Sequence, residues 1–213
     1  MEWLGNGALP MGLVFMSVTV FGVLRRKAGH VLAARDYPAL AERIGLTHRA
    51  SPYKTGVGSL TGELGGLRVI VDPDDQRWIA VRYGDVDRPR IEVHTYEHNK
   101  RMPSGLRSFR VADKKLMGWF KTAYGAAEEI QALEALGPVL GPLRSIRQLK
   151  SFSITSSGLT AVFDYGSPPF IPVATVQEVV PALVRAAQAL AEAAVPELDP
   201  GSPDGENTND FKD

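Results

Sequence analysis

One motif in the sequence has residue types and a spacing that could carry out chemistry, the His-x-x-Glu-His of His94, Glu97 and His98. On a helix, the two histidines would lie one turn apart on one face and could bind zinc, with Glu97 as the general base. On a strand, side chains alternate between faces, so the histidines would stay together and Glu97 would point away. The surrounding R-I-E-V-H-T-Y is rich in β-branched and aromatic residues and predicts a strand. We therefore expect no metal site, and a row of His94, Tyr96 and His98 suited to surface recognition.

Other catalytic and cofactor-binding patterns are absent from the sequence. It has no cysteine and no G-x-S-x-G, which excludes a thiol nucleophile, cysteine-ligated metals and a nucleophile elbow. Gly56, Gly58 and Gly62 precede a predicted strand, whereas a dinucleotide-binding glycine motif opens a helix. The sequence therefore predicts no cofactor and favours a non-catalytic binding or scaffolding module. The alternative is an enzyme at a membrane surface, metal-dependent through His94 and His98.

A basic stretch follows the histidine motif. Its one acid is Asp113, and its basic members are Lys100, Arg101, Arg107, Arg110, Lys114 and Lys115. Each basic residue close to an anionic leaflet contributes about 1 kcal/mol of attraction. We expect a solvated loop, and the alternative is contact with an anionic lipid surface. The nearby Phe109, Trp119 and Phe120 are expected in the core rather than as platforms for bases, so nucleic acid is not an expected partner.

The N-terminal region contains an uncharged apolar stretch. Residues 8–24 come close to the ~20 residues that a membrane-spanning helix needs, and Trp3 is placed where an interfacial aromatic would lie. The basic residues that follow are Arg25, Arg26 and Lys27. A cleaved signal peptide would have the opposite charge order, and a small domain rarely buries a helix that is apolar all round. We expect a single-pass anchor in the inner (cytoplasmic) membrane, with the N-terminus outside and the domain cytoplasmic.

Composition and charge describe an ordinary folded domain with unlike ends. Hydrophobic residues make up 44% of the chain and charged residues 23%, and the formal net charge is zero. The basic excess lies near the N-terminus, whereas residues 197–213 hold six acids and one lysine. The tail from residue 196 on is rich in Pro, Gly, Asp and Glu, so we predict disorder, because it buries too little apolar surface to offset its ordering entropy.

The pattern between 57 and 112 indicates an antiparallel sheet of four or five strands. Residues 57–64 and 67–72 are expected to form a hairpin that turns at Gly65 and Gly66. Two further strands are expected around 77–83 and 90–96, and a short one at 108–111. Residues 151–165 predict a second hairpin, with its bend at 156–158.

Helical periodicity marks the remaining elements. A short helix is expected over 36–44, and a longer one over 114–149, broken by G-P-V-L-G-P-L. The last helix is expected over 175–194, with Thr175 and Glu178 as a capping box and Pro181 producing a kink or a later start.

A resemblance emerges from this order of elements. The phrases YPALAERIGL, GELGGLRVIVDPDDQRWIAVRYG, and LGPVLGPLRSI followed by SFSITSSGLTAVFD resemble uncharacterised bacterial single-pass membrane proteins with a small α+β domain. The resemblance covers most of the chain and implies no activity. The expected fold class is α+β: an N-terminal transmembrane helix, then a mostly antiparallel sheet packed by two or three helices. The expected domains are an anchor over 1–30, an α+β domain over 31–195 and a disordered acidic tail over 196–213. The expected partners are the lipid bilayer and a protein.

Overall fold

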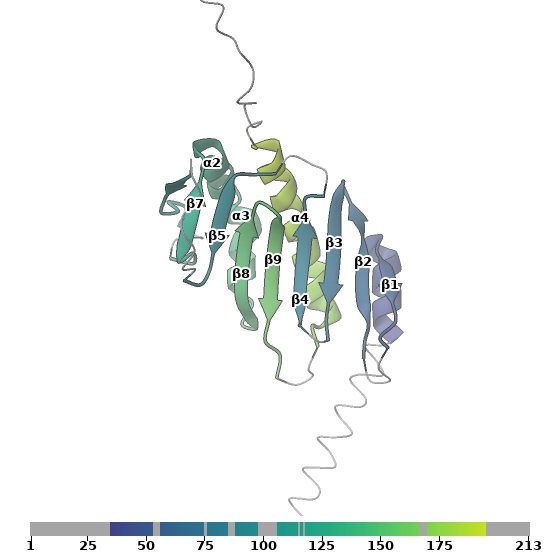
Figure 1. Cartoon of the computed structure of the whole chain (residues 1–213). Helices are drawn as coiled ribbons and strands as arrows, with labels where there is room; N and C mark the ends of the chain where they lie inside the picture. Colours follow the sequence, from purple (N-terminus) through teal and green to yellow (C-terminus); the bar gives the residue numbers. More distant parts are fainter. Residues whose placement is uncertain are drawn as a thin grey trace, which may run out of the picture.

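The structure is a computed structural model, and it describes residues 35–52, 56–74, 76–84, 88–97, 106–114, 116, 118–166 and 170–194. Within these residues the chain forms one antiparallel sheet of nine strands and four helices. Figure 1 shows the sheet in front, with α3 (Gly137–Arg144) and α4 (Val173–Glu192) behind it. The strand order is β1-β2-β3-β4-β9-β8-β5-β7-β6, so the second hairpin lies in the middle of the sheet.

The strand bounds agree with most of the predicted strands. The strands are β1 (Thr47–Arg49), β2 (Ser59–Leu64), β3 (Leu67–Asp72), β4 (Trp78–Arg82), β5 (Ile91–His94), β6 (Arg107–Ser108), β7 (Thr122–Gly125), β8 (Leu149–Thr155) and β9 (Gly158–Phe163). The predicted antiparallel sheet and both hairpins are confirmed, but the sheet is larger than four or five strands because the second hairpin, β1 and β7 also belong to it.

The first hairpin shows how local sequence specifies register. Gly65 and Gly66 have φ angles of 60° and 77°, a conformation that residues with a Cβ rarely adopt. A two-residue turn with both angles positive matches the twist of the flanking strands, so Leu64 pairs directly with Leu67. That register directs Val69 of β3 to the helix-covered face, where it is fully buried.

The helices bury their apolar stripes against that face. The α4 helix packs on β3, β4 and β9, and Val176, Leu183 and Leu190 are fully buried at helical spacing. Residues 35–44 form a helix in which Leu40 is buried. The α2 helix (Ala127–Ala135) packs against both α3 and α4. One core therefore lies between the sheet and these helices.

Two local predictions were wrong, and a third was right only in part. Residues 122–125, placed in a helix by periodicity, form β7, because they pair with both β5 and β6. The predicted break of the helix does occur, at Leu136 between α2 and α3, but the G-P-V-L-G-P-L stretch then forms α3 itself. Pro138 fits there because it stands in the first turn, where its missing N–H has no partner to lose. The capping box is also absent, since α4 already begins at Val173, and the Thr175 hydroxyl lies 2.9 Å from that of Tyr165.

The predicted transmembrane helix requires a correction. In the part of the chain that the structure describes, no helix combines the length and the apolar character needed to cross a bilayer. The α4 helix has 20 residues but one wholly apolar face only, and exposed Glu178 and Arg185 lie on its other side. The fold class is α+β with a large antiparallel sheet, and the description as a single-pass membrane protein is not supported. The proposed span at 8–24, with Trp3, Arg25, Arg26 and Lys27, and the tail at 196–213 lie outside the described residues.

Candidate functional site

The histidine motif does not assemble a metal site in the described residues. His94 is the last residue of β5, where it is buried, and its Nε2 atom lies 3.0 Å from Oε1 of Glu92 on the same face of the strand. Glu97 is exposed beyond the strand end, and His98 lies outside the described residues. The described part of the chain contains no group of three or more His, Cys, Asp or Glu residues able to hold a metal ion. Tyr96 does contact His94, with ring centroids 4.9 Å apart, as the predicted row requires.

A deeper candidate site lies at the opposite end of the sheet from β1. There a hollow of about 430 Å³ runs between β7 and the chain that precedes it, and we call it the β7 groove. Its described lining consists of residues 108–111, Leu116, Gly118 and residues 120–124. Three of these side chains are aromatic, Phe109, Phe120 and Tyr124, and two are cationic, Arg110 and Lys121. The groove therefore combines apolar walls with positive charge.

Backbone hydrogen bonds hold both ends of the groove. The Phe109 N–H donates to the Ala123 carbonyl at 3.2 Å, which continues the pairing of β6 with β7. The Lys121 N–H donates to the His94 carbonyl at 2.8 Å, which fixes the residue just before β7 against the end of β5. Lys121 and Arg110 are thus attached to the sheet through their own or neighbouring backbone.

Aromatic packing fixes the segment that lies between Phe109 and Lys121. The Trp119 ring stacks on Phe152 of β8, with centroids 5.1 Å apart and planes 1° from parallel. Phe120 contacts the same ring at 6.3 Å, and both Trp119 and Phe120 pack against the core. The prediction that Phe109, Trp119 and Phe120 belong to the core is therefore confirmed in part, since Phe109 and Phe120 also line the groove.

The cations around the groove lack partners in the described structure. Arg107, Arg110, Lys114 and Lys121 are all exposed. Among the described residues, none of the four side chains forms a hydrogen bond or an ion pair. The nearby acids serve the backbone: Asp113 accepts from the Leu116 N–H at 3.0 Å, and Glu134 from the Ala112 N–H at 2.9 Å. Within the part of the chain that the structure describes, no acid forms an ion pair with these four cations.

The groove overlaps the predicted basic cluster only in Arg110. Arg107, Arg110 and Lys114 are described and exposed, whereas Lys100, Arg101 and Lys115 lie outside the described residues. Lys121 was not predicted as a member of this cluster. The segment from 114 onward was predicted as a helix, and a helix gave no reason to place Lys121 beside Arg110. The strand-like T-A-Y that follows it was the available signal, since β-branched and aromatic residues favour strands.

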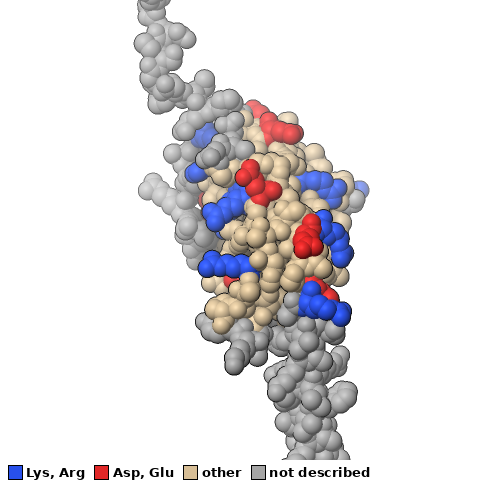
Figure 2. All heavy atoms as spheres, turned by 90° about the vertical axis from the view of Figure 1, so that its right-hand side faces the viewer, with Lys and Arg blue, Asp and Glu red and all other residues tan. Residues whose placement is uncertain are grey.

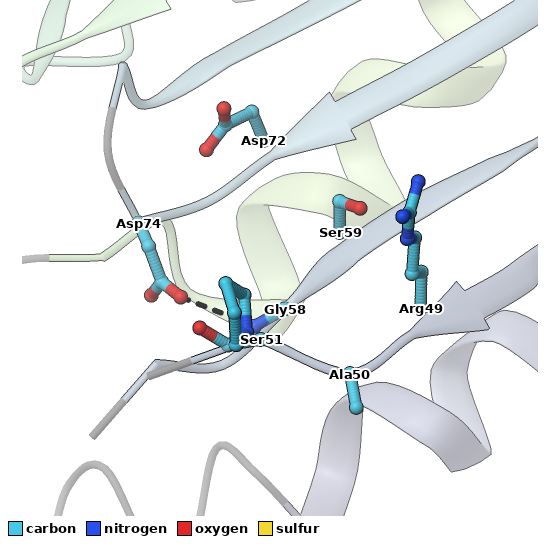
Figure 3. A pocket seen from close by; sticks show the side chains of 8 residues that line it. Arg49, Ala50, Ser51, Gly58, Ser59, Asp72 and Asp74 are labelled. Atoms are coloured by element: carbon cyan, nitrogen blue, oxygen red, sulfur yellow. Dashed lines mark hydrogen bonds between the residues drawn. The ribbon is translucent and has the colours of Figure 1, made fainter. Parts of the chain in front are cut away.

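A second hollow, of about 420 Å³, lies beside the β1–β2 end of the sheet (Figure 3). Arg49 and Ser59 pair across β1 and β2, and Asp72 lies on β3. Figure 3 shows Asp74 pointing toward the loop below, where its carboxylate accepts hydrogen bonds from the N–H groups of Val57 and Gly58. This hollow carries charges of both signs, and one of its acids holds the loop in place, so it favours no single class of ligand.

Asp74 supports the loop, and a substitution tests this. We expect Asp74→Ala to lower the free energy of unfolding by about 1–3 kcal/mol, because two backbone donors lose a charged acceptor. Urea denaturation measures the change. Asp164→Ala is the matched control, because this exposed acid lies 3.9 Å from Arg77 and should contribute less than ~1 kcal/mol. Equal effects of the two substitutions would contradict the role of Asp74.

A buried acid links the residue before β5 to the start of α2. Glu129 of α2 is fully buried, and its carboxylate accepts hydrogen bonds from the N–H groups of Arg90 and Ala126, the latter at 3.2 Å. Tyr83 is also fully buried, and burial, followed by the negative charge of Glu129, raises the pKa of its hydroxyl well above the ordinary value. Glu129 therefore acts as a structural acceptor.

The opposite side of the molecule offers no comparable charge pattern. Figure 2 views the protein from the β1 side and shows basic and acidic side chains interspersed over this surface. Such a mixture produces no extended field of one sign. Among the described residues, unpaired cations beside an aromatic hollow are thus a feature of the β7 groove.

Comparisons with known proteins identify no family for this chain. No protein-family model and no curated protein matches its sequence. Among solved structures, it is similar to the crystal structure of the mycobacterial trehalose monomycolate transport factor A, TtfA, with a TM-score of 0.44 and 11% sequence identity. The match covers 78% of this chain and 98% of that chain. A similarity at this level assigns neither fold nor function.

Proposed function

We propose that this protein is a non-catalytic binding module that takes an acidic, aromatic-containing segment of a protein partner into the β7 groove. The observation that carries the proposal is the position of Arg110 and Lys121. Both are exposed, neither has an ion-pair partner among the described residues, and both line a hollow with aromatic walls.

Carboxylates are the ligands that such cations recognise best in a protein partner. A guanidinium binds a carboxylate through two parallel hydrogen bonds, and an ammonium acts as a compact point charge. Positive charge beside a concave surface also raises the rate of encounter with an anionic partner. Phe109, Phe120 and Tyr124 would meanwhile contact the apolar part of the ligand, which supplies affinity that salt does not screen.

The groove offers binding groups rather than a catalytic set. Its described lining contains neither a carboxylate nor a histidine, the side chains that most often carry out general acid–base catalysis. Its hydroxyl groups belong to Ser108, Thr122 and Tyr124, and the hydroxyl of Thr122 donates to the Tyr96 carbonyl at 3.3 Å. These observations favour recognition over turnover.

A protein segment fits the groove better than a nucleic acid does. Nucleic-acid binding requires a basic stripe that follows many phosphates, whereas the described lining holds two cations within a single hollow. A hollow of about 430 Å³ accommodates a few side chains. We therefore expect the bound element to be short, with carboxylates on either side of an aromatic or aliphatic residue.

Peptide binding tests this function directly. We expect the full chain to bind a fluorescein-labelled peptide of alternating glutamate and phenylalanine with micromolar affinity, and to bind the glutamine–phenylalanine counterpart at least tenfold more weakly, or about 1.4 kcal/mol. Arg110→Ala combined with Lys121→Ala should weaken binding of the acidic peptide by a similar factor. Fluorescence anisotropy measures these three affinities.

A second pair of cations provides the control. Arg147 and Lys150 are exposed near the start of β8 and do not line the groove, so Arg147→Ala with Lys150→Ala should leave the affinity within about twofold. Equal loss in both double variants would show that overall charge, not the groove, attracts the peptide. Binding only to vesicles containing phosphatidylserine, with no peptide binding, would likewise contradict the proposal.

A further inference from the structure

We infer that the occupant of the β7 groove within this protein is its own C-terminal segment, residues 196–213. This inference rests on the proposed function, because it assigns to the same site a regulator that competes with the external partner. Three observations carry it: the chemistry of the segment, the place where the chain leaves the described structure, and the length that remains.

The segment has the chemistry that the groove selects. It carries one aromatic residue, Phe211, placed between Asp210 and Lys212. Its acids are Glu197, Asp199, Asp204, Glu206, Asp210 and Asp213. The carboxylates complement the cations beside the groove, and the Phe211 ring complements its aromatic walls. The excess of negative charge in the segment thus matches the unpaired positive charge around β7.

The chain leaves the described structure at the end of α4, a helix that packs against α2. The α4 helix ends at Glu192, and Figure 1 shows its C-terminal end beside α2. The α2 helix packs against α4 and directly follows β7, the strand that forms one wall of the groove. Residues 195–213 can extend about 60 Å at ~3.3 Å per residue, so reach does not limit the contact.

A tethered ligand needs little intrinsic affinity to occupy its site. Attachment to the same chain through a short linker produces an effective concentration in the millimolar range. A segment that would bind in trans only at high micromolar concentration therefore occupies the groove most of the time in cis. The apparent affinity for an external partner is then lowered in proportion to the fraction of molecules whose groove is free of the segment.

A zero-length cross-link tests the contact without any external ligand. Carbodiimide joins a lysine amine to a carboxylate that touches it, and we expect intramolecular cross-links from Lys121 to acids of residues 196–213, detected by mass spectrometry in the full chain. Lys150, exposed on β8, is the internal control and should yield few. Lys121→Arg keeps the positive charge and should abolish the Lys121 cross-link. Equal cross-linking of Lys121 and Lys150, or cross-links found only between chains, would overturn the inference.

Competition separates this inference from the proposed function. A full-length variant with the six tail acids replaced by Asn or Gln, and with Phe211→Ala, should bind the acidic peptide about threefold to tenfold more tightly than the wild-type chain. The gain should vanish when Arg110→Ala and Lys121→Ala are added. Equal affinity of the variant and the wild-type chain would overturn the inference and leave the proposed function standing. No peptide binding by either chain would overturn the proposed function itself.

Discussion

Replacing Phe152 with alanine (Phe152→Ala) is expected to lower the free energy of unfolding by about 3–5 kcal/mol, among the largest effects of any single change. Its side chain is 1% exposed and stacks on Trp119. Removing the ring deletes its transfer free energy and leaves a cavity that the β8 strand, held on both sides by β5 and β9, cannot close. Urea denaturation followed by tryptophan fluorescence measures the loss.

The same substitution should also weaken peptide binding at the β7 groove, because Phe120, which lines the groove, and its neighbour Trp119 both pack on Phe152. Phe152→Leu is the matched control, since it keeps most of the volume and should cost no more than about 1.5 kcal/mol. A loss below 1 kcal/mol in Phe152→Ala would contradict the packing. Unchanged peptide affinity in a folded Phe152→Ala variant would show that the groove wall does not depend on this ring.

Replacing Glu129 with alanine (Glu129→Ala) is expected to lower the free energy of unfolding by about 2–4 kcal/mol. The change leaves the N–H groups of Arg90 and Ala126 without their acceptor in a partly buried place, at about 1–3 kcal/mol for each. It also removes a negative charge from the first turn of α2, where the helix dipole stabilises it. Thermal and urea unfolding would both report the loss.

The neighbouring residues provide sharp controls for Glu129. Glu128 precedes it on the same helix turn but is exposed, so Glu128→Ala should change the free energy of unfolding by no more than about 0.5 kcal/mol. Tyr83→Phe should also be close to neutral, because the buried hydroxyl has no hydrogen-bond partner among the described residues. Similar destabilisation by Glu128→Ala and Glu129→Ala would contradict the role assigned to the buried carboxylate.

Elements that depend on neighbours in sequence were predictable. The Gly65–Gly66 turn specifies the register of its hairpin through backbone angles alone, and the apolar stripe of α4 identifies the face that it buries. These signals persist in any tertiary context, because they arise from the conformations open to a few adjacent residues. The same holds for His94 as a strand residue, which β-branched and aromatic neighbours indicated.

Elements that depend on distant pairing were not predictable. Thr122–Gly125 has apolar spacing compatible with a helix, and only the hydrogen bonds offered by β5 and β6 make it a strand. Likewise, Leu140 and Leu143 stabilise α3 by burial, although its Pro and Gly residues predict a break. Local preferences of a few tenths of a kcal/mol per residue yield to such contacts.

In the candidate site, too, some features follow from adjacent residues and others only from tertiary contacts. The sequence by itself determined that the chain carries a basic stretch, an aromatic group near it, an acidic C-terminal segment and no evident catalytic set. Only the tertiary structure decided that Arg110 and Lys121, which come from opposite ends of the segment preceding β7, line one hollow. The pairing of β6 with β7 and the stacking of Trp119 on Phe152 bring them together, and neither contact can be read from residues adjacent in the chain.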